Sequence, residues 1–288
     1  MKIIENYKNI SSSYLIDSEN KWKNISIFWW IHWDEKSWIL ACKKFLKNVD
    51  DWEIEILKWK IILVLKSNEE AVKINKREVK FNLNRLFKDN SDIENCYEKN
   101  RAEELKTILQ ESDYLLDLHS TSWPSIPFLF SEMPNFDLAK KLWVNHIIAW
   151  WNELWWVISW DTESYINSLW WQWFTFEAWN YDNPDWEKIA YQMLLNFLSQ
   201  LWIISNKYFK NILELEEKFI KMKSVYIAKS NNFKYKIDIE NFKEIKKWTL
   251  IWIDNWEKIF AEEDIFLIMP KKEEIIEKWV EVFFIWNK

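Results

Sequence analysis

Glycine is absent from this chain of 288 residues, whereas tryptophan occurs 25 times. Globular chains usually contain about 7% glycine, which serves backbone positions with positive φ. Many tryptophans stand where a turn calls for glycine, as Trp248 and Trp256 do in KKWTLIWIDNWEK. We hypothesise that many of them are glycines in the natural protein. Some bacteria read the codon UGA as glycine, and a translation table that reads UGA as tryptophan would produce this pattern.

Cysteine is scarce, and long apolar runs and excess positive charge are missing. The two cysteines, Cys42 and Cys96, show no metal-ligand spacing and are predicted to be ordinary buried thiols of a cytoplasmic protein. No apolar run reaches the roughly 18 residues of a membrane span, and the first residues, MKIIENYKNISSS, lack the features of a signal peptide. The net charge of -6 argues against a nucleic-acid-binding protein.

The hydrophobic pattern predicts an α/β protein with a mixed central sheet flanked by helices, followed by a small β-rich domain. Strands are predicted at 24–31, 60–65, 114–118, 128–130 and 174–177, and helices at 37–47, 91–110, 183–201 and 207–222. Short alternating strands follow at 225–229, 233–238, 249–253, 257–260, 264–269 and 280–285. We expect a catalytic domain over 1–222 and a β-rich domain over 223–288.

Two of the three histidines directly follow predicted strands. His32 and Glu35 are three residues apart in I-H-W-D-E, and His119 follows a second buried strand in D-L-H-S-T. Two imidazoles and one carboxylate can hold zinc and leave a fourth position for water. Because ligands bind at the carboxyl ends of strands in open α/β sheets, the two segments point to one cleft.

Two further motifs strengthen this pattern. The first is N-x-x-A followed by R-x4-N-L-N-R-x-F, which spans residues 68–87 and includes Arg77, Asn84 and Arg85. The second is the predicted strand F-T-F-E, which ends at Glu177 and is followed by Ala178 and Trp179. With the two histidine segments, the order and spacing resemble those of the succinylglutamate desuccinylase/aspartoacylase family, which is related to the zinc carboxypeptidases. The β-rich tail is similar to the small C-terminal domain of that family.

The chain departs from the family pattern in a consistent way. Tryptophan stands at 29, 30, 33 and 179, where the family has glycine, and this agrees with the recoding hypothesis. Glu69 replaces a proline, which is a minor change in a loop. Asn82 replaces an aspartate that is thought to orient its neighbours.

The resemblance implies a role for each motif residue. His32, Glu35 and His119 would bind one Zn²⁺, which lowers the pKa of a water molecule to about 7. Glu177 would take a proton from that water and deliver it to the leaving amine. Arg77 would stabilise the developing oxyanion.

In the same motif, Asn84 and Arg85 would bind the carboxylate of the amino-acid part of the substrate, for which a guanidinium fork is well suited. Asp117 is a candidate for orienting its neighbours, and Thr121, Glu163 and Tyr165 are weaker candidates for the pocket wall. The remaining histidine, His146, matches no motif and is expected to be structural or exposed.

The sequence therefore predicts a zinc-dependent hydrolase that cleaves the amide of a small N-acyl amino acid, with no nucleic-acid or membrane partner. A zinc carboxypeptidase-like peptidase for short peptides would share the same metal site. A catalytically inactive relative that binds a carboxylate is disfavoured by the intact Glu177. A tryptophan-rich carbohydrate-binding module would need exposed aromatic platforms, whereas these tryptophans fall in turns and catalytic motifs.

Overall fold

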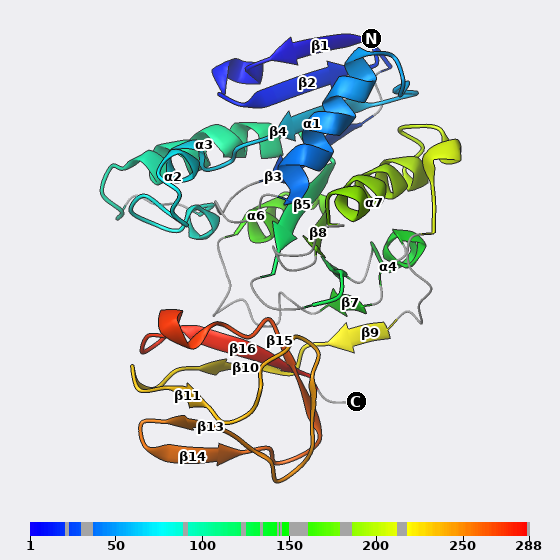
Figure 1. The fold of residues 1–288 in the computed structure, drawn as a ribbon. Helices are drawn as coiled ribbons and strands as arrows, with labels where there is room; N and C mark the ends of the chain where they lie inside the picture. Colours follow the sequence, from blue (N-terminus) through cyan, green and yellow to red (C-terminus); the bar gives the residue numbers. More distant parts are fainter. Residues whose placement is uncertain are drawn as a thin grey trace.

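A large mixed sheet and a smaller antiparallel β region make up the chain in the computed structural model (Figure 1). The structure describes residues 1–20, 23–29, 37–88, 92–121, 125–132, 135–142, 144, 146–149, 161–178, 186–211 and 218–286. None of the helices in these ranges is long and apolar enough to cross a membrane.

The large sheet has nine strands within the described ranges. Their spatial order is β1 (Lys2–Glu5), β2 (Ser13–Asp17), β4 (Lys60–Val64), β3 (Asn24–Trp29), β5 (Tyr114–Ser120), β8 (Gln172–Ala178), β6 (Phe128–Ser131), β7 (His146–Ala149) and β9 (Lys218–Lys221). The central strands β4, β3, β5 and β8 are parallel, so their carboxyl ends lie at one edge. β6 runs antiparallel to β8 and begins at that edge.

Helices cover both faces of this sheet, as the alternation of strand and helix patterns predicts. Helices α1 (Ser37–Asp50) and α7 (Trp186–Gln200) pack on one face with Leu116 and Leu118 of β5. Helices α3 (Tyr97–Leu109) and α6 (Thr162–Ser168) pack on the other face with Leu115. Shorter helices are α2 (Glu69–Lys73), α4 (Phe136–Ala139), η1 (Tyr7–Asn9), η2 (Leu83–Arg85), η4 (Lys140–Leu142), η6 (Asn206–Tyr208) and η7 (Glu273–Ile275).

The C-terminal region is antiparallel and has its own apolar core. One sheet has the order β10 (Ser224–Ile227), β16 (Glu281–Trp286), β15 (Ile265–Ile268) and β12 (Glu244–Ile245). The other has β11 (Lys234–Tyr235), β13 (Leu250–Asp254) and β14 (Glu257–Phe260). The predicted fold class, a mixed α/β sheet with a β-rich C-terminal part, is confirmed. The division into independent domains at 222 and 223 stays a prediction.

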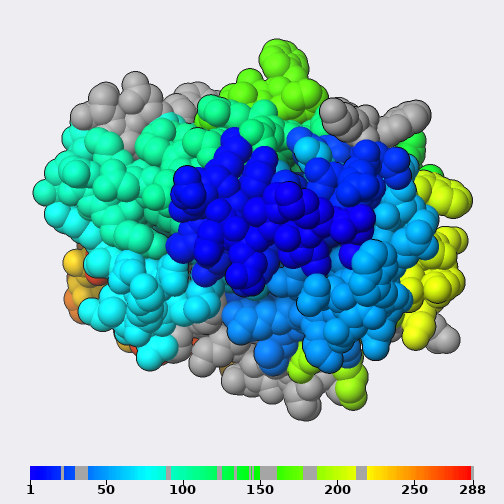
Figure 2. All heavy atoms as spheres, turned by 90° about the horizontal axis from the view of Figure 1, so that it is seen from above, coloured from blue at the N-terminus to red at the C-terminus, as the bar shows by residue number. Residues whose placement is uncertain are grey.

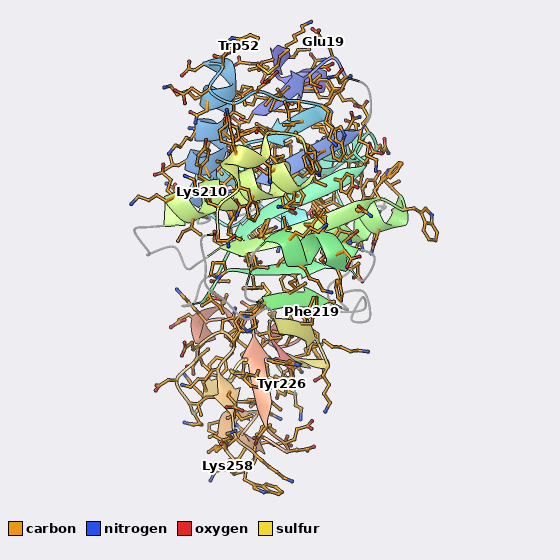
Figure 3. All side chains as sticks on the ribbon, turned by 90° about the vertical axis from the view of Figure 1, so that its right-hand side faces the viewer. Glu19, Trp52, Lys210, Phe219, Tyr226 and Lys258 are labelled. Carbon is orange, nitrogen blue, oxygen red and sulfur yellow. The ribbon has the colours of Figure 1, made fainter. Side chains whose placement is uncertain are left out.

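Aromatic stacking joins the β-rich region to the large sheet. The ring of Phe242 stacks on His146, with centroids 4.2 Å apart, and meets Phe128 edge-on at 5.1 Å. The Asn241 side chain also donates to the Ser125 hydroxyl at 2.9 Å. In Figure 3 Phe219 lies near this junction, and Lys258 lies at the far end of the β-rich region. The contact places the β-rich region beside the first residues of β6 and β7.

Two predicted helices need correction, and one hairpin was not predicted. The helix expected from residue 91 begins at Tyr97, with Cys96 as its cap residue. The helix expected over 207–222 is wrong, because η6 occupies its start and the edge strand β9 its end. In that strand Ile220 is buried while Phe219 is exposed, which is the alternation of a strand. The hairpin β1–β2 was not predicted, and Figure 2 shows these N-terminal residues across the end of the molecule opposite the β-rich region.

Two helices end in a motif that normally requires glycine. At the end of α6, the N–H of Trp170 bonds to Asn167 and that of Trp171 bonds to Ile166. These bonds form a Schellman motif whose left-handed residue is Trp170, with φ of 62°. The end of α7 repeats the pattern with Trp202 at φ of 58°. Glycine is the usual residue at such a position because it has no Cβ to clash.

Tight turns in the β-rich region place tryptophan at the same kind of backbone. Asn255 and Trp256 form the two-residue loop between β13 and β14, both with positive φ, where Asn-Gly is the usual pair. Trp248 and Trp279 are the third residues of turns closed by Thr249 and Val280, with φ of 68° and 71°. A positive φ at the third turn position favours glycine.

We propose that the tryptophans at these left-handed positions are encoded by UGA and are glycine in the natural protein. Seven of the sixteen described residues with positive φ are tryptophan. Most of these seven are largely exposed, so packing does not account for the indole. The gene sequence tests the proposal directly: UGA is expected at Trp170, Trp202 and Trp256, and UGG at these positions would refute it.

The same strain should be measurable in the tryptophan form of the chain. Trp170→Gly should raise the free energy of unfolding by about 1 kcal/mol, because a left-handed residue with a side chain costs about 1–2 kcal/mol. Trp171→Gly is the matched control, because the indole of Trp171 is also exposed but the φ of Trp171 is not positive. That control should lower the free energy of unfolding in a urea titration. Equal losses in both variants would contradict the strain.

Candidate active site

The pairing of two parallel strands brings the central residues of the site together. In the register of β5 and β8, His119 lies opposite Glu177, and Asp117 lies opposite Thr175. Residues that are opposite in register point to the same face of a sheet. These four side chains therefore share the face covered by α6, and His119 and Glu177 stand at the carboxyl ends of their strands.

The third strand of this group ends at the same edge. Trp29, the last residue of β3, pairs with Leu118, the residue before His119. The segment that contains the predicted ligands His32 and Glu35 follows a few residues later in the chain. Both of these residues lie outside the described residues, so their role as zinc ligands stays a proposal.

A buried carboxylate orients His119. The Nε2 atom of His119 lies 3.3 Å from Oδ1 of Asp117, and both side chains are buried. A carboxylate that receives Nε2–H assigns the metal-binding lone pair to the other ring nitrogen, Nδ1. On the backbone side, the indole of Trp38 donates to the carbonyl oxygen of His119 at 2.6 Å. Asp117 thus has the position that the sequence suggested for an orienting residue.

A second carboxyl group lies on the same face and is held by two threonines. The hydroxyl of Thr162 donates to Oδ2 of Asp117 at 2.5 Å and lies 3.0 Å from Oε2 of Glu163. The hydroxyl of Thr175 donates to Oε1 of Glu163 at 2.5 Å. All four residues are buried, so each hydrogen bond offsets the cost of removing a polar group from water.

The surroundings of Glu163 favour its protonated form. The pKa of Glu163 is raised to about 8, mainly by burial and then by the negative charges of Asp161 and Asp117, which outweigh the lowering by His119 and by the hydrogen bond from Thr175. At neutral pH this carboxyl group therefore keeps its proton for most of the time. One buried negative charge beside His119 costs less than two.

Protonation of Glu163 also completes the hydrogen bonding. The Thr162 hydroxyl has one hydrogen, which is directed at Asp117 by the shorter contact. A protonated Glu163 can donate from Oε2 to the Thr162 oxygen. Every contact in the series then has one donor and one acceptor. The series runs from Glu163 through Thr162 and Asp117 to His119.

The described residues contain one group with the donors of a metal site. Ligand atoms of Asp117, His119 and Glu163 lie within 4.8 Å of one another. Imidazole nitrogen and carboxylate oxygen are donors that zinc accepts. Since both carboxyl groups are already hydrogen-bonded to threonine, the donor set fits a metal bound by His119 with Asp117 as its orienting carboxylate.

The motif at 68–87 owes its shape to capping asparagines. Oδ1 of Asn68 accepts from Ala71 N–H at the start of α2, and Oδ1 of Asn82 accepts from Asn84 N–H at the start of η2. The second bond explains why asparagine can replace the family's aspartate at 82. The cap needs only an acceptor oxygen, which an amide provides.

This capped turn joins Asn84 to the buried network. Oδ1 of Asn84 accepts from the backbone N–H of Thr162 at 3.2 Å, and Asn84 itself is buried. Nη1 of Arg85 donates to the carbonyl oxygen of Asn84 at 2.7 Å, which anchors a half-buried guanidinium beside the site. Arg77 is exposed on the loop that precedes η2. The structure thus joins Asn84 to the buried network and places Arg85 next to it on the same turn, whereas no hydrogen bond described for Arg77 joins it to Glu177 or His119.

The third arginine has a different environment. Arg101 in α3 is buried and donates to the carbonyl oxygens of Ser67, Ser11 and Lys66 at 2.9–3.0 Å. These bonds tie loops together and satisfy most of the guanidinium. Arg101 is therefore structural, which agrees with its place outside the motifs.

Some residues of the buried network were missed or ranked low from the sequence. Thr162 and Thr175 were not singled out, and Glu163 was only a weak candidate. Their common signal is a hydroxyl or carboxyl group within a buried segment, but it becomes specific only when α6 is placed against β8. Tyr165 instead lies near the surface and bonds to Gln110, and Thr121 is buried at the end of β5.

The remaining expectations concern the thiols and His146. Cys42 is buried, which raises the pKa of its thiol to about 12, while Cys96 is half-buried. The predicted burial is therefore confirmed for Cys42, whereas Cys96 is only partly buried. His146 was expected to be either structural or exposed. It is buried and stacks on Phe242, which agrees with a structural role.

A comparison with protein families matches the part of the chain that holds the first three motifs. Residues 23–148 match the model described as Succinylglutamate desuccinylase/Aspartoacylase catalytic domain. This range contains the segments of His32, Arg85 and His119, and it confirms the resemblance found in the sequence. No curated protein matches the chain.

Solved structures share the fold over nearly the whole chain. Succinylglutamate desuccinylase from Vibrio cholerae has a TM-score of 0.75 at 16% identity and covers 98% of this chain and 89% of its own. The enzyme of that name from Vibrio parahaemolyticus has a TM-score of 0.72 at 18% identity, covering 96% and 86%. The product-bound ectoine utilization protein EutE (DoeB) from Ruegeria pomeroyi has 0.72 at 15%, covering 96% and 88%. At these identities the likeness establishes the fold.

The hydroxyl of Thr162 should be important for stability. Thr162→Val removes the donor to the buried Asp117 and should lower the free energy of unfolding by about 1–3 kcal/mol, the usual cost of an unsatisfied buried acceptor. Thr107→Val is the matched control, because its exposed hydroxyl bonds only within α3 and its loss should cost less than about 0.5 kcal/mol. Equal stability of the two variants in urea titrations would show that the network contributes nothing.

Proposed function

We propose that this chain, whose residues 23–148 carry the catalytic domain of the succinylglutamate desuccinylase/aspartoacylase family, is a zinc-dependent hydrolase of small N-acyl amino acids. The observation that carries the proposal is the register of β5 and β8. It sets the candidate ligand His119 beside the candidate acid–base residue Glu177 at the carboxyl end of the sheet. We further propose that the protein acts in the cytoplasm.

His32, Glu35 and His119 are the proposed zinc ligands. Zinc, when bound, supplies a Lewis acid and lowers the pKa of a water molecule to about 7. Asp117 holds the His119 ring by accepting from Nε2, and Thr162 in turn fixes Asp117. Outer carboxylates of this kind raise the basicity and fix the direction of a histidine ligand.

Glu177 is the proposed proton carrier. Its side chain is buried at the end of β8, next in register to His119, within the water-excluding surroundings of the site. A carboxylate there can accept the proton of the attacking water and later donate it to the amine that leaves. The balance is one water consumed, one amide bond broken, and one carboxylic acid and one amine formed.

Asn84 and Arg85 are the proposed anchors for the amino-acid carboxylate. They lie on one capped turn, and Asn84 is tied directly to the buried network through Thr162. A guanidinium binds a carboxylate through two parallel hydrogen bonds, which fixes both position and orientation. Arg77, which precedes them on an exposed loop, is proposed to stabilise the oxyanion once substrate is bound.

The first test joins metal content to turnover in the same sample. We expect about one zinc per chain, release of free amino acid from a panel of N-acyl amino acids, and loss of turnover on chelation. Glu177→Gln should lower kcat by about 10²–10⁴-fold, the usual contribution of acid–base catalysis, while zinc content stays unchanged. Zinc without turnover on any acyl amino acid would favour a peptidase or a carboxylate-binding relative, and absence of zinc would refute the site.

The proposed binding of the substrate carboxylate by Arg85 can be tested by changing either the protein or the substrate. Arg85→Lys should raise KM for an N-acyl amino acid by about tenfold, because lysine lacks the planar fork. The control is the same substrate with its carboxylate converted to a neutral amide, for which wild type and variant should have equal kcat/KM. An equal loss on both substrates would assign Arg85 a structural role.

A further inference from the structure

Two charged residues of the β-rich region meet the proposed substrate anchor. Oε1 of Glu281 lies 2.7 Å from Nζ of Lys271 and 3.8 Å from Nη2 of Arg85. The first distance is a charge-assisted hydrogen bond, whereas the second is an ion pair without one. One carboxylate is thus shared unequally between a lysine and the arginine that is proposed to hold the substrate.

The backbone fixes the geometry of this cluster. Glu281 is the first residue of β16, and the N–H of Lys271 donates to the neighbouring Val282 carbonyl at 2.8 Å. The Tyr235 hydroxyl also donates to the carbonyl oxygen of Lys271 at 3.2 Å. Lys271 and Glu281 are therefore held as neighbours within the β-rich region, and the stacking of Phe242 on His146 docks that region against the large sheet.

The charges in the cluster act on one another. Burial lowers the pKa of Lys271, Glu281 opposes this, and the positive charges of Arg77 and Arg85 lower it further. Burial alone would raise the pKa of Glu281, but Lys271 and Arg85 outweigh it, so the pKa is lowered. Two cations, Lys271 and Arg85, therefore flank the Glu281 carboxylate, and the positive charge of Arg77 also acts on Lys271. The positive charges outnumber the one carboxylate, which favours an anionic ligand.

We propose that Lys271 and Glu281 are positioning residues that control how strongly Arg85 binds the substrate carboxylate. Lys271 holds the Glu281 carboxylate through a hydrogen bond and so prevents it from neutralising the guanidinium. The β-rich region thereby tunes substrate affinity without contacting the reacting atoms. This inference rests on the proposed role of Arg85 in the hydrolase.

The pairing of Lys271 with Glu281 predicts effects on substrate affinity that a loss of packing would not produce. Without Lys271, arginine is the remaining ion-pair partner of the Glu281 carboxylate among the described residues, so this carboxylate competes with the substrate for Arg85. Without Glu281, Arg85 has no ion pair to another carboxylate within the described ranges, and its guanidinium is open to the substrate. Removing the two members of one ion pair should therefore change substrate affinity in opposite directions, whereas loss of packing would weaken it in both.

The test is a double-mutant cycle in steady-state kinetics. Lys271→Met should raise KM for the best N-acyl amino acid about fivefold, and Glu281→Gln should lower KM about threefold, since the pair is only part-exposed. The double variant should return close to Glu281→Gln, because Lys271 acts only through that carboxylate. kcat should stay within about twofold of wild type in all three variants. Increases of KM in both single variants would overturn the proposal.

Two controls separate this inference from its alternatives. Lys246→Met removes another lysine of the β-rich region that pairs with Glu244 and Asp264, and it should leave KM unchanged. Thermal unfolding of each variant shows whether the fold is retained, and the substrate with a neutral amide in place of its carboxylate should show none of the KM changes. If the wild type hydrolyses no acyl amino acid, the proposed function fails. If it does so but the cycle shows no sign reversal, only this inference fails.

Discussion

The parallel pairing of β5 with β8 is the constraint on which the candidate site depends. Its register sets His119 beside Glu177 and Asp117 beside Thr175. A shift of one residue would turn one member of each pair to the opposite face of the sheet. The apolar residues between them, such as Leu118 and Phe176, pack against α1 and α7 and so hold the register by burial. The same hydrophobic core that stabilises the fold thereby aligns the polar groups.

Burial on the other face makes the polar groups interdependent. Asp117 and Glu163 are too close and too deeply buried for both to be charged at low cost, and the raised pKa of Glu163 is the result. Threonine suits this place because one hydroxyl can accept from a protonated carboxyl and donate to an ionised one. Thr162 does so at the start of α6, where its backbone N–H also reaches Asn84. Thr162 therefore joins the proposed substrate anchor Asn84 to Asp117 of the proposed metal centre through hydrogen bonds.

The β-rich region contributes in two ways. Its aromatic contacts through Phe242 fix its place beside β6 and β7, and this brings Glu281 to the turn that carries Arg85. Its tight turns also contain residues that do not suit their backbone conformation. Trp248, Trp256 and Trp279 have positive φ, which favours glycine. Such a local conflict is uncommon in natural sequences, whose local preferences agree with the fold. The proposed reading of UGA as glycine would remove the conflict at all of these turns.

The sequence by itself was sufficient to find the family resemblance and the fold class. Apolar patterns were sufficient for the long buried strands and for α1, because their apolar spacing agrees with their final surroundings. It failed for β9, where a four-residue strand forms only because the edge of β7 is available to pair with it. The start of α3 was also misplaced, since the capping pattern at 91–94 lies before the segment that packs on the sheet.

Tertiary structure alone decided which polar groups meet. The roles of Thr162 and Glu163 require α6 to pack against β5 and β8, and neither residue has a distinctive spacing in the chain. The meeting of Arg85 with Lys271 and Glu281 requires the β-rich region to dock on the large sheet. Sequence patterns report which face of an element is buried, but contacts between distant segments arise only when complementary apolar surfaces bring them together.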